Sequence, residues 1–247
     1  MSKVFGEVLR DLSFGPLANL SIGGEGSGVV DPAAEFRFVS LTNTALLDLH
    51  GKFQLYTREV MIRKLDGRTL YPLMTSHGDA YVDGSNPGNE PEKFIIDTVE
   101  SPFQEDVLKI ITAWGPPDPM FDPEEPVELP IDDEGCENSI YLPATDIIQI
   151  PFGEDGEVFS FTYQAKHPNI GIGDNNQPIY LPDNLYEALE CYIAHKIFAS
   201  MNGEEHTRRA ADLLVRYEMI CGKVTEKDLA QESTSTTHTK LEDRGFV

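Results

Sequence analysis

The spacing of apolar side chains near the start of the chain predicts two helices. Residues 3–12 carry Val4, Val8, Leu9 and Leu12 on one side. A second segment, 31–50, repeats apolar residues at intervals of about 3.6, namely Phe38, Leu41, Ala45, Leu46 and Leu49. Asp31 and Pro32 are typical of a helix start, since one can cap the free N–H groups and the other presets the first turn. Gly51 ends this predicted helix.

After Gly51 the pattern changes to short runs rich in β-branched and aromatic residues, which predict strands. Two of them, 53–65 and 68–74, flank Asp66-Gly67, a pair that readily adopts positive φ and therefore predicts a two-residue hairpin. The remaining strand candidates are 94–99, 107–114, 139–142, 146–150 and 158–165. The middle of the chain therefore reads as a β module.

One connection in this module, residues 115–135, has a different composition. It contains six prolines and a dense series of acidic side chains. Proline cannot donate to a sheet ladder, and clustered charge favours solvation. We expect an extended loop that projects into solvent.

Helical spacing returns after Pro182 and Asp183. Apolar residues surround nearly the whole helix over 185–201, so we expect other elements to cover it on several sides. Asn202-Gly203 breaks the pattern. A second helix follows over 204–221, with a narrower apolar stripe and an end at Gly222. Its other face carries Arg208, Asp212 and Arg216 at i, i+4 spacing and is expected to be solvated.

These patterns predict an α+β fold. The helices of 1–52 and 179–222 would form one α-helical bundle, the β-rich module of 53–178 would be inserted between them, and 223–247 would form an extended C-terminal arm. The arm is rich in Ser and Thr and has almost no apolar residues before Leu241, so alone it cannot offset its ordering entropy. It is either a dispensable terminus or a segment that orders on a partner.

Composition narrows the function classes. The 247 residues include 42 acidic and 19 basic side chains, a formal net charge of −23, so a nucleic-acid backbone could be bound only by a minority basic patch. We attribute most of the acidity to solubility. The three cysteines are widely spaced, and those within the predicted helices read as small buried apolar residues. The sequence shows no apolar run that suits a membrane span and no signal peptide, so we expect synthesis and folding in a reducing cytoplasm.

The motifs that usually carry chemistry are incomplete. The glycine segment 23–30 lacks a P-loop ending and a preceding strand, and reads as a connector. The six histidines show no zinc-binding spacing, and no serine lies in a nucleophile elbow. An acidic cluster could hold calcium, but its order differs from that of an EF-hand loop; its members are Asp132, Asp133, Glu134 and Glu137. We expect no catalytic residue, metal site or cofactor. Trp114, which ends a predicted strand, reads as a core or interface anchor.

Four segments resemble the head-to-tail adaptor proteins of short-tailed bacteriophages, also called connector or tail tubular proteins. They are LANLSIGGEGSGVV (17–30), TALLDLHGKFQLYTREVMIRKL (44–65), LPDNLYEALECYIAHKIF (181–198) and RRAADLLVRYEMIC (208–221). The resemblance covers both ends of the chain better than the β-rich middle.

The resemblance implies a structural virion protein that is not an enzyme. Twelve copies would form a ring in the neck between the portal protein and a tail tube or nozzle protein, and DNA would pass through without being read. The C-terminal arm of that family typically reaches the portal, which makes Leu241, Arg244, Phe246 and Val247 candidate portal contacts here. An acidic channel would keep passing DNA from adhering to its wall.

Two alternatives stay open at the level of sequence. One is a different neck or tail protein of a phage, which an exposed 115–135 loop at an outer rim would favour. The other is a hydrolase that works through acidic residues of the β module, which would require a cleft with convergent titratable groups.

Overall fold

The computed structural model describes residues 3–18, 20, 32–82, 91–117 and 126–227. It has the α+β fold class predicted from the sequence. The chain divides into two compact units. The helical unit consists of Met1–Leu55 with Asn169–Val247, and the β unit consists of Tyr56–Pro168.

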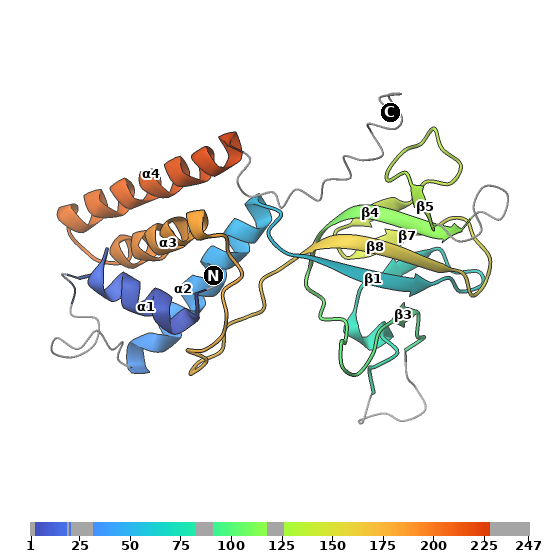
Figure 1. Cartoon of the computed structure of the whole chain (residues 1–247), viewed down its shortest axis with the longest axis horizontal. Coiled ribbons are helices and arrows are strands. Elements are labelled where there is room, and N and C mark those ends of the chain that lie inside the picture. The colour runs from blue at the N-terminus through green and yellow to red at the C-terminus, as the bar shows by residue number, and fades with distance from the viewer. Residues whose placement is uncertain (1–2, 19, 21–31, 83–90, 118–125, 228–247) are drawn as a thin grey trace, which may run out of the picture. The chain divides into compact units, whose positions relative to one another are not determined.

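The helical unit contains α1 (Phe5–Phe14), α2 (Pro32–Lys52), the short 3-10 helix η2 (Asp183–Leu185), α3 (Tyr186–Ala199) and α4 (Glu204–Glu226). Helix α3 packs against α1, α2 and α4 (Figure 1). Its buried residues lie on most of its circumference: Tyr186, Ala188, Leu189, Cys191, Ile193, Ala194, Ile197 and Phe198. The prediction that this helix is covered on several sides is confirmed, and helices of the same chain provide the cover.

The first residues of the chain are joined to the segment that leads into α3. Ile179 N–H donates to the Lys3 carbonyl at 2.9 Å, and Phe5 N–H donates to the Gln177 carbonyl at 3.0 Å. The Tyr186 hydroxyl accepts the Lys3 N–H at 2.8 Å. Segments more than 170 residues apart in sequence therefore build one helical unit.

Residues 169–178, within the range predicted for the β module, pack in the helical unit. The Asn43 side chain of α2 both donates to the Ile170 carbonyl at 3.0 Å and accepts its N–H at 2.9 Å. Ile170 and Ile179 are buried in the helical core.

Helix α4 differs from the prediction at its C-terminal end. It continues through Gly222 to Glu226, so the predicted end at Gly222 is wrong. The reason is Val224, which continues the buried stripe formed by Tyr217 and Cys221 and is only 2% exposed. Burial of this side chain favours one more turn despite the glycine.

The β unit contains two antiparallel sheets. The larger has the strand order β3-β1-β8-β4-β5, with β1 (Thr57–Arg63), β3 (Ile95–Ile96), β4 (Val107–Pro117), β5 (Pro126–Leu129) and β8 (Val158–Ala165). The smaller has the order β2-β7-β6, with β2 (Leu70–Pro72), β6 (Tyr141–Ala144) and β7 (Ile147–Gln149). A 3-10 helix, η1 (Thr75–His77), follows β2. Alternate side chains of β1 and β8 enter a shared core with Tyr71, Phe94 and Ile148.

The predicted hairpin at Asp66-Gly67 is wrong. The turn itself forms, with Gly67 at φ +68°. However, β1 pairs with β8 and β3, whereas β2 pairs with β7, so the turn joins two different sheets. Lys64 fixes this corner, since its ammonium donates to the carbonyls of Arg68 at 2.5 Å and Ile150 at 2.9 Å.

The expected loop over 115–135 contains a strand. Residues Pro126–Leu129 form β5, which pairs with the end of β4 through Ala113↔Leu129 and Gly115↔Val127. Pro126 is tolerated here because β5 lies at the edge of its sheet, where one side of the strand has no ladder partner among the described residues. Residues 118–125 lie outside the described residues.

Candidate functional site

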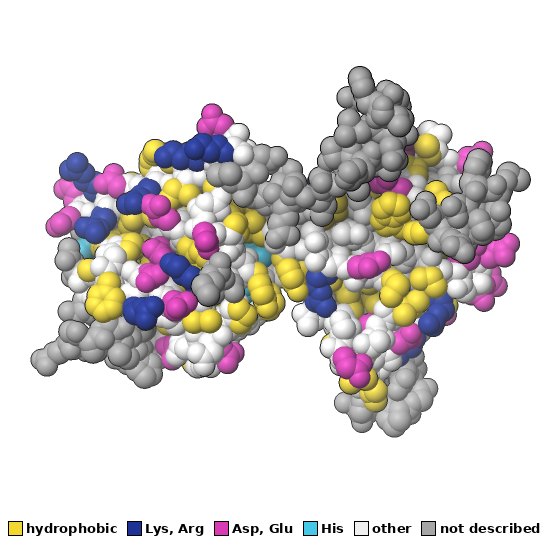
Figure 2. Space-filling view, in the orientation of Figure 1, with side chains coloured by type: hydrophobic (Ala, Val, Ile, Leu, Met, Phe, Trp, Pro, Cys, Tyr) yellow, Lys and Arg dark blue, Asp and Glu magenta, His cyan; other side chains and the backbone are white. Residues whose placement is uncertain are grey.

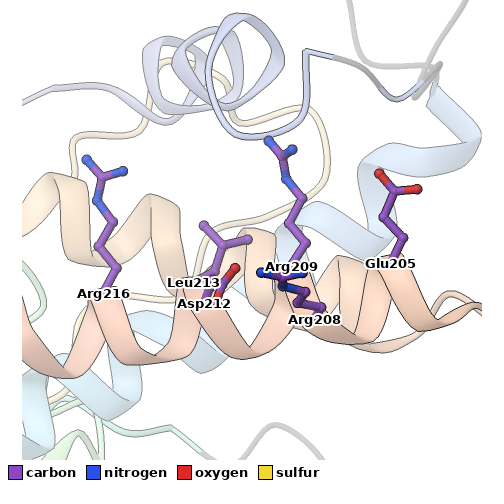
Figure 3. Close-up of a pocket in the computed structure, with 6 residues that line it drawn as sticks. All are labelled: Glu205, Arg208, Arg209, Asp212, Leu213 and Arg216. Atoms are coloured by element: carbon purple, nitrogen blue, oxygen red, sulfur yellow. The ribbon is translucent and has the colours of Figure 1, made fainter.

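The predicted portal contacts Leu241, Arg244, Phe246 and Val247 lie outside the described residues, as does the glycine segment 23–30. Within the described part of the chain, a surface feature with several charged side chains lies on α4. It is a depression of about 370 Å³ lined by Glu205, Arg208, Arg209, Asp212, Leu213 and Arg216 (Figure 3).

Two arginines extend from α4 in the same direction, with Leu213 between them (Figure 3). Arg209 and Arg216 are seven residues apart, which corresponds to about 10.5 Å along a helix axis at 1.5 Å per residue. Asp212 lies between them in sequence, and Glu205 lies one turn before Arg209. The lining therefore offers cationic donors beside an apolar side chain and two carboxylates.

Neighbouring elements hold two of the three arginines. Arg216 donates from Nε to Glu187 Oε1 of α3 at 2.8 Å, with a second bond from Nη2 to the same oxygen. This hydrogen bond raises the pKa of Arg216 above its usual value. Arg209 donates to the Pro16 carbonyl at 3.3 Å, and its guanidinium lies 5.2 Å from the ring centroid of Phe198.

Arg208 differs from the other two arginines. It is exposed, and no ion pair or hydrogen bond joins its guanidinium to any residue that the structure describes. A guanidinium in this state can bind a carboxylate without first breaking an internal pair.

Beside the depression, α4 exposes apolar side chains. Val215 and Met219 are each 55% exposed and lie one turn apart, and Ala211 precedes them by one more turn. Together with Arg208, Asp212 and Arg216 they form one side of the helix, which we call the α4 outer face. Figure 2 shows Lys and Arg side chains along α4, with Asp and Glu between them.

The charge of the chain is unevenly divided between the units. The β unit has 23 acidic and 7 basic side chains, a formal charge of −16. The helical unit has 19 acidic and 12 basic side chains, a formal charge of −7. The segment Arg208–Arg216 of α4, with three arginines and one aspartate, is thus locally basic in an acidic protein.

Two polar networks were missed by sequence reasoning. In the helical unit, the buried Tyr217 hydroxyl of α4 donates to Asp48 Oδ2 of α2 and accepts from Lys52 Nζ at 3.0 Å. Burial and the bond to Asp48 raise the pKa of Tyr217. In the β unit, Asp106 accepts from Tyr163 at 2.8 Å and from Arg58 at 3.0 Å. No sequence pattern indicates either network, because the partners are 48 to 169 positions apart.

The carboxylates of the predicted acidic cluster accept hydrogen bonds from nearby backbone N–H groups. Asp132 accepts the Leu142 N–H at 2.9 Å, and Asp133 accepts the Gly135 N–H at 2.8 Å. Over residues 3–227, apart from the gaps given above, no three His, Cys, Asp or Glu side chains gather as potential metal ligands.

Three histidine rings pack against or bond to other elements. His195 Nδ1 lies 2.9 Å from the Ala210 carbonyl and joins α3 to α4. His77 stacks on Phe94, and His206 stacks on Phe198. Trp114, an expected core or interface anchor, is half-buried in β4, and its Nε1 donates to Thr112 Oγ1 at 3.2 Å.

Among the described helices, none combines the length and the apolar character that crossing a membrane requires. Comparison of the sequence with protein-family models finds no match, and comparison with the curated proteins also finds none.

Proposed function

We propose that the protein is a structural component of a phage virion, a head-to-tail adaptor that forms a ring between the portal and the tail. In this proposal the helical unit is a bundle made from both ends of the chain, and the β unit is a module inserted into it. The function is non-enzymatic, and DNA passes through the ring without sequence-specific contacts.

The observation that carries the proposal is the way in which the chain is divided. The residues before Leu55 and those after Asn169 form one unit, and the intervening chain forms another. The backbone bonds of Phe5 and Ile179 close the helical unit across this insertion. The same order of helices, β module and helices is implied by the resemblance to head-to-tail adaptors.

The C-terminal arm provides the portal contact in this proposal. It follows α4, and its apolar residues Leu241, Phe246 and Val247 lie at the end of an otherwise polar segment. A polar arm that carries a few apolar anchors suits a partner with matching pockets, because the arm can order on binding. Arg244 would add a charged contact with carboxylates of the portal.

The acidity of the β unit suits a wall that DNA must pass without adhering. A formal charge of −16 per copy repels a phosphate backbone if it faces the channel. An assembled ring whose lumen is basic would contradict this part of the proposal.

The direct test is binding of the purified protein to purified portal rings, measured by sedimentation and visualised by electron microscopy. Full-length protein is expected to add a ring to the portal. Deletion of residues 233–247 is expected to reduce portal affinity at least tenfold, which corresponds to about 1.4 kcal/mol.

A matched pair of variants separates the anchors from the rest of the arm. Leu241→Asp with Phe246→Asp is expected to reproduce the loss, whereas Thr236→Asp with Thr237→Asp adds the same charge and is expected to keep affinity. Unchanged binding by the deletion would refute the anchor assignment. Turnover of a small substrate by the isolated protein, abolished by replacing convergent carboxylates, would refute the proposed function in favour of a hydrolase.

A further inference from the structure

We propose that the α4 outer face binds an acidic surface on a second copy of this chain. The inference deepens the proposed function and rests on its requirement for self-association. It names one of the two surfaces through which neighbouring copies would join.

The exposure of apolar side chains on α4 is the first argument. The buried side of the helix is complete, since Ala210, Tyr217, Cys221 and Val224 pack into the helical core. Val215 and Met219 lie on the opposite side, each 55% exposed, in line with Ala211. Exposed apolar side chains of this kind contribute little to the stability of the fold. Covering them with a second surface is favourable, because it removes apolar area from water.

The composition of the face favours a protein partner over a nucleic acid. Arginine and methionine are enriched in protein interfaces, and lysine is depleted. The stretch Arg208–Met219 has three arginines and a methionine but no lysine. Glu205 and Asp212 in the lining would oppose a phosphate backbone, whereas they can accept hydrogen bonds from a protein.

Charge complementarity identifies the partner as a second copy. Most of the surface charge of this chain is negative, and 23 of the 42 carboxylates lie in the β unit. Arg208 has no partner among the described residues, so it can pair with a carboxylate supplied from another molecule. Two copies thus carry complementary surfaces at different places on the molecule.

This arrangement has a consequence for assembly. A basic face that meets an acidic surface elsewhere on the neighbour makes a heterologous contact, which repeats from copy to copy and closes into a ring when the rotation permits. An isologous contact between two α4 outer faces would bring Arg208 of one copy near the arginines of the other, which is unfavourable.

The depression beside the face adds two guanidinium groups that are already held in place. Arg209 and Arg216 extend on the same side of α4, with Leu213 between them (Figure 3). Arg216 is anchored by Glu187, and Arg209 is anchored by Pro16 and Phe198, so both guanidinium groups are held before binding. Preorganised donors lose less entropy when a partner binds.

The test measures self-association of the purified full chain by sedimentation velocity over a range of concentrations. Arg208→Glu is expected to weaken association at least tenfold. Arg10→Glu makes the same change at an exposed position of α1 and is expected to have less than a twofold effect. Val215→Asp is expected to weaken association similarly, and Ile172→Asp, at a position of the helical unit that is 63% exposed, serves as its control.

Salt distinguishes the charge argument from apolar contact alone. If arginine–carboxylate pairs contribute, association of the unmodified protein weakens between low salt and about 0.5 M NaCl, because pairs near the surface are screened. The Arg208→Glu variant should show a smaller salt dependence. Far-UV circular dichroism and thermal unfolding establish that each variant is folded, so that a loss of association is not a loss of structure.

The possible outcomes separate this inference from the proposed function. If the protein forms rings and both α4 variants form them equally well, the face is not an interface and the adaptor proposal stands. If the protein associates through the face but neither closes into rings nor binds portals, the inference stands and the adaptor proposal fails. A protein that stays monomeric at all concentrations contradicts the inference, while portal binding by the monomer would still support the adaptor.

A photo-crosslinker placed at Met219 identifies what covers the face. In the purified protein it is expected to crosslink two copies, with the second attachment in an acidic segment, whereas the same group at Ile172 of the helical unit should not. Attachment in a basic segment of the second copy would refute the proposed complementarity.

Discussion

Replacement of Tyr217 by phenylalanine is expected to destabilise the helical unit. Tyr217 is 2% exposed, and its ring packs against Tyr192 with ring centroids 5.2 Å apart. The burial of the ring and its contact with Tyr192 both survive the change. Only the hydroxyl is lost, and with it the bond to Asp48 and the bond from Lys52.

The magnitude follows from the two partners. A hydrogen bond to a charged group contributes about 1.5–3 kcal/mol. The Asp48 and Lys52 side chains are 33% and 45% exposed and keep their own ion pair at 2.8 Å, so water can replace the hydroxyl. We therefore expect a loss of about 1–2 kcal/mol in the free energy of unfolding, at or below the lower end of that range.

Two optical signals separate the units. The CD signal at 222 nm follows the helices, whereas Trp114, the sole tryptophan, lies in β4 and reports on the β unit. Urea unfolding of Tyr217→Phe should show an earlier CD transition and an unchanged fluorescence transition. Tyr192→Phe is the matched control, because its hydroxyl makes no hydrogen bond with any of the described residues.

The effect should also depend on pH. The folded protein raises the pKa of Tyr217 above its usual value of 10.0, mainly through burial. The contribution of the hydroxyl is complete below that value and declines at higher pH, because the unfolded chain then loses the phenolic proton first. The difference between the unmodified protein and Tyr217→Phe should therefore shrink above about pH 10. Equal stability of both proteins at pH 7, or a shift confined to the Trp114 transition, would refute the reasoning.

Three further predictions concern single side chains. Val224→Ala should reduce the free energy of unfolding by about 1–2 kcal/mol in the CD transition, since it removes buried methyl groups, whereas Val215→Ala should stay within about 0.5 kcal/mol; equal effects would contradict helix packing beyond Gly222. Lys64→Met should reduce the free energy of unfolding of the β unit, followed by Trp114 fluorescence, by about 1–3 kcal/mol, because the carbonyls of Arg68 and Ile150 lose their donor. Lys109→Met, at an exposed position, is the control. Burial raises the pKa of the Glu190 carboxyl, so its contribution to stability is present below about pH 4.5 and is lost as pH rises through the folded pKa. Glu190→Gln should therefore raise the stability of the protein at pH 7. A thermal midpoint that falls at pH 7 would show that the 3.8 Å contact with Lys3 outweighs the burial of the charge.

Periodicity along the chain determined the elements whose signal is local. The spacing of apolar residues in α3 predicted both the helix and its cover on several sides, because each residue's side of a helix follows from its position alone. The same reasoning located α1, α2 and most of α4, and the β-rich runs located β4 and β8 closely. Composition alone determined that the chain is acidic. Only the division into two units showed that the β unit is strongly acidic and the helical unit less so.

Strand partners, the end of α4 and the polar networks were decided only by the tertiary structure. Asp66-Gly67 encodes a turn but not the sheet that receives the next strand, so β1 and β2 pair with β8 and β7 instead of with each other. Val224 extends α4 because the core of the helical unit covers it, and Tyr217 meets Asp48 because two helices pack. Such contacts join residues far apart in sequence, and their free energy exists only after the chain has brought them together, whereas helical periodicity is present in every short segment.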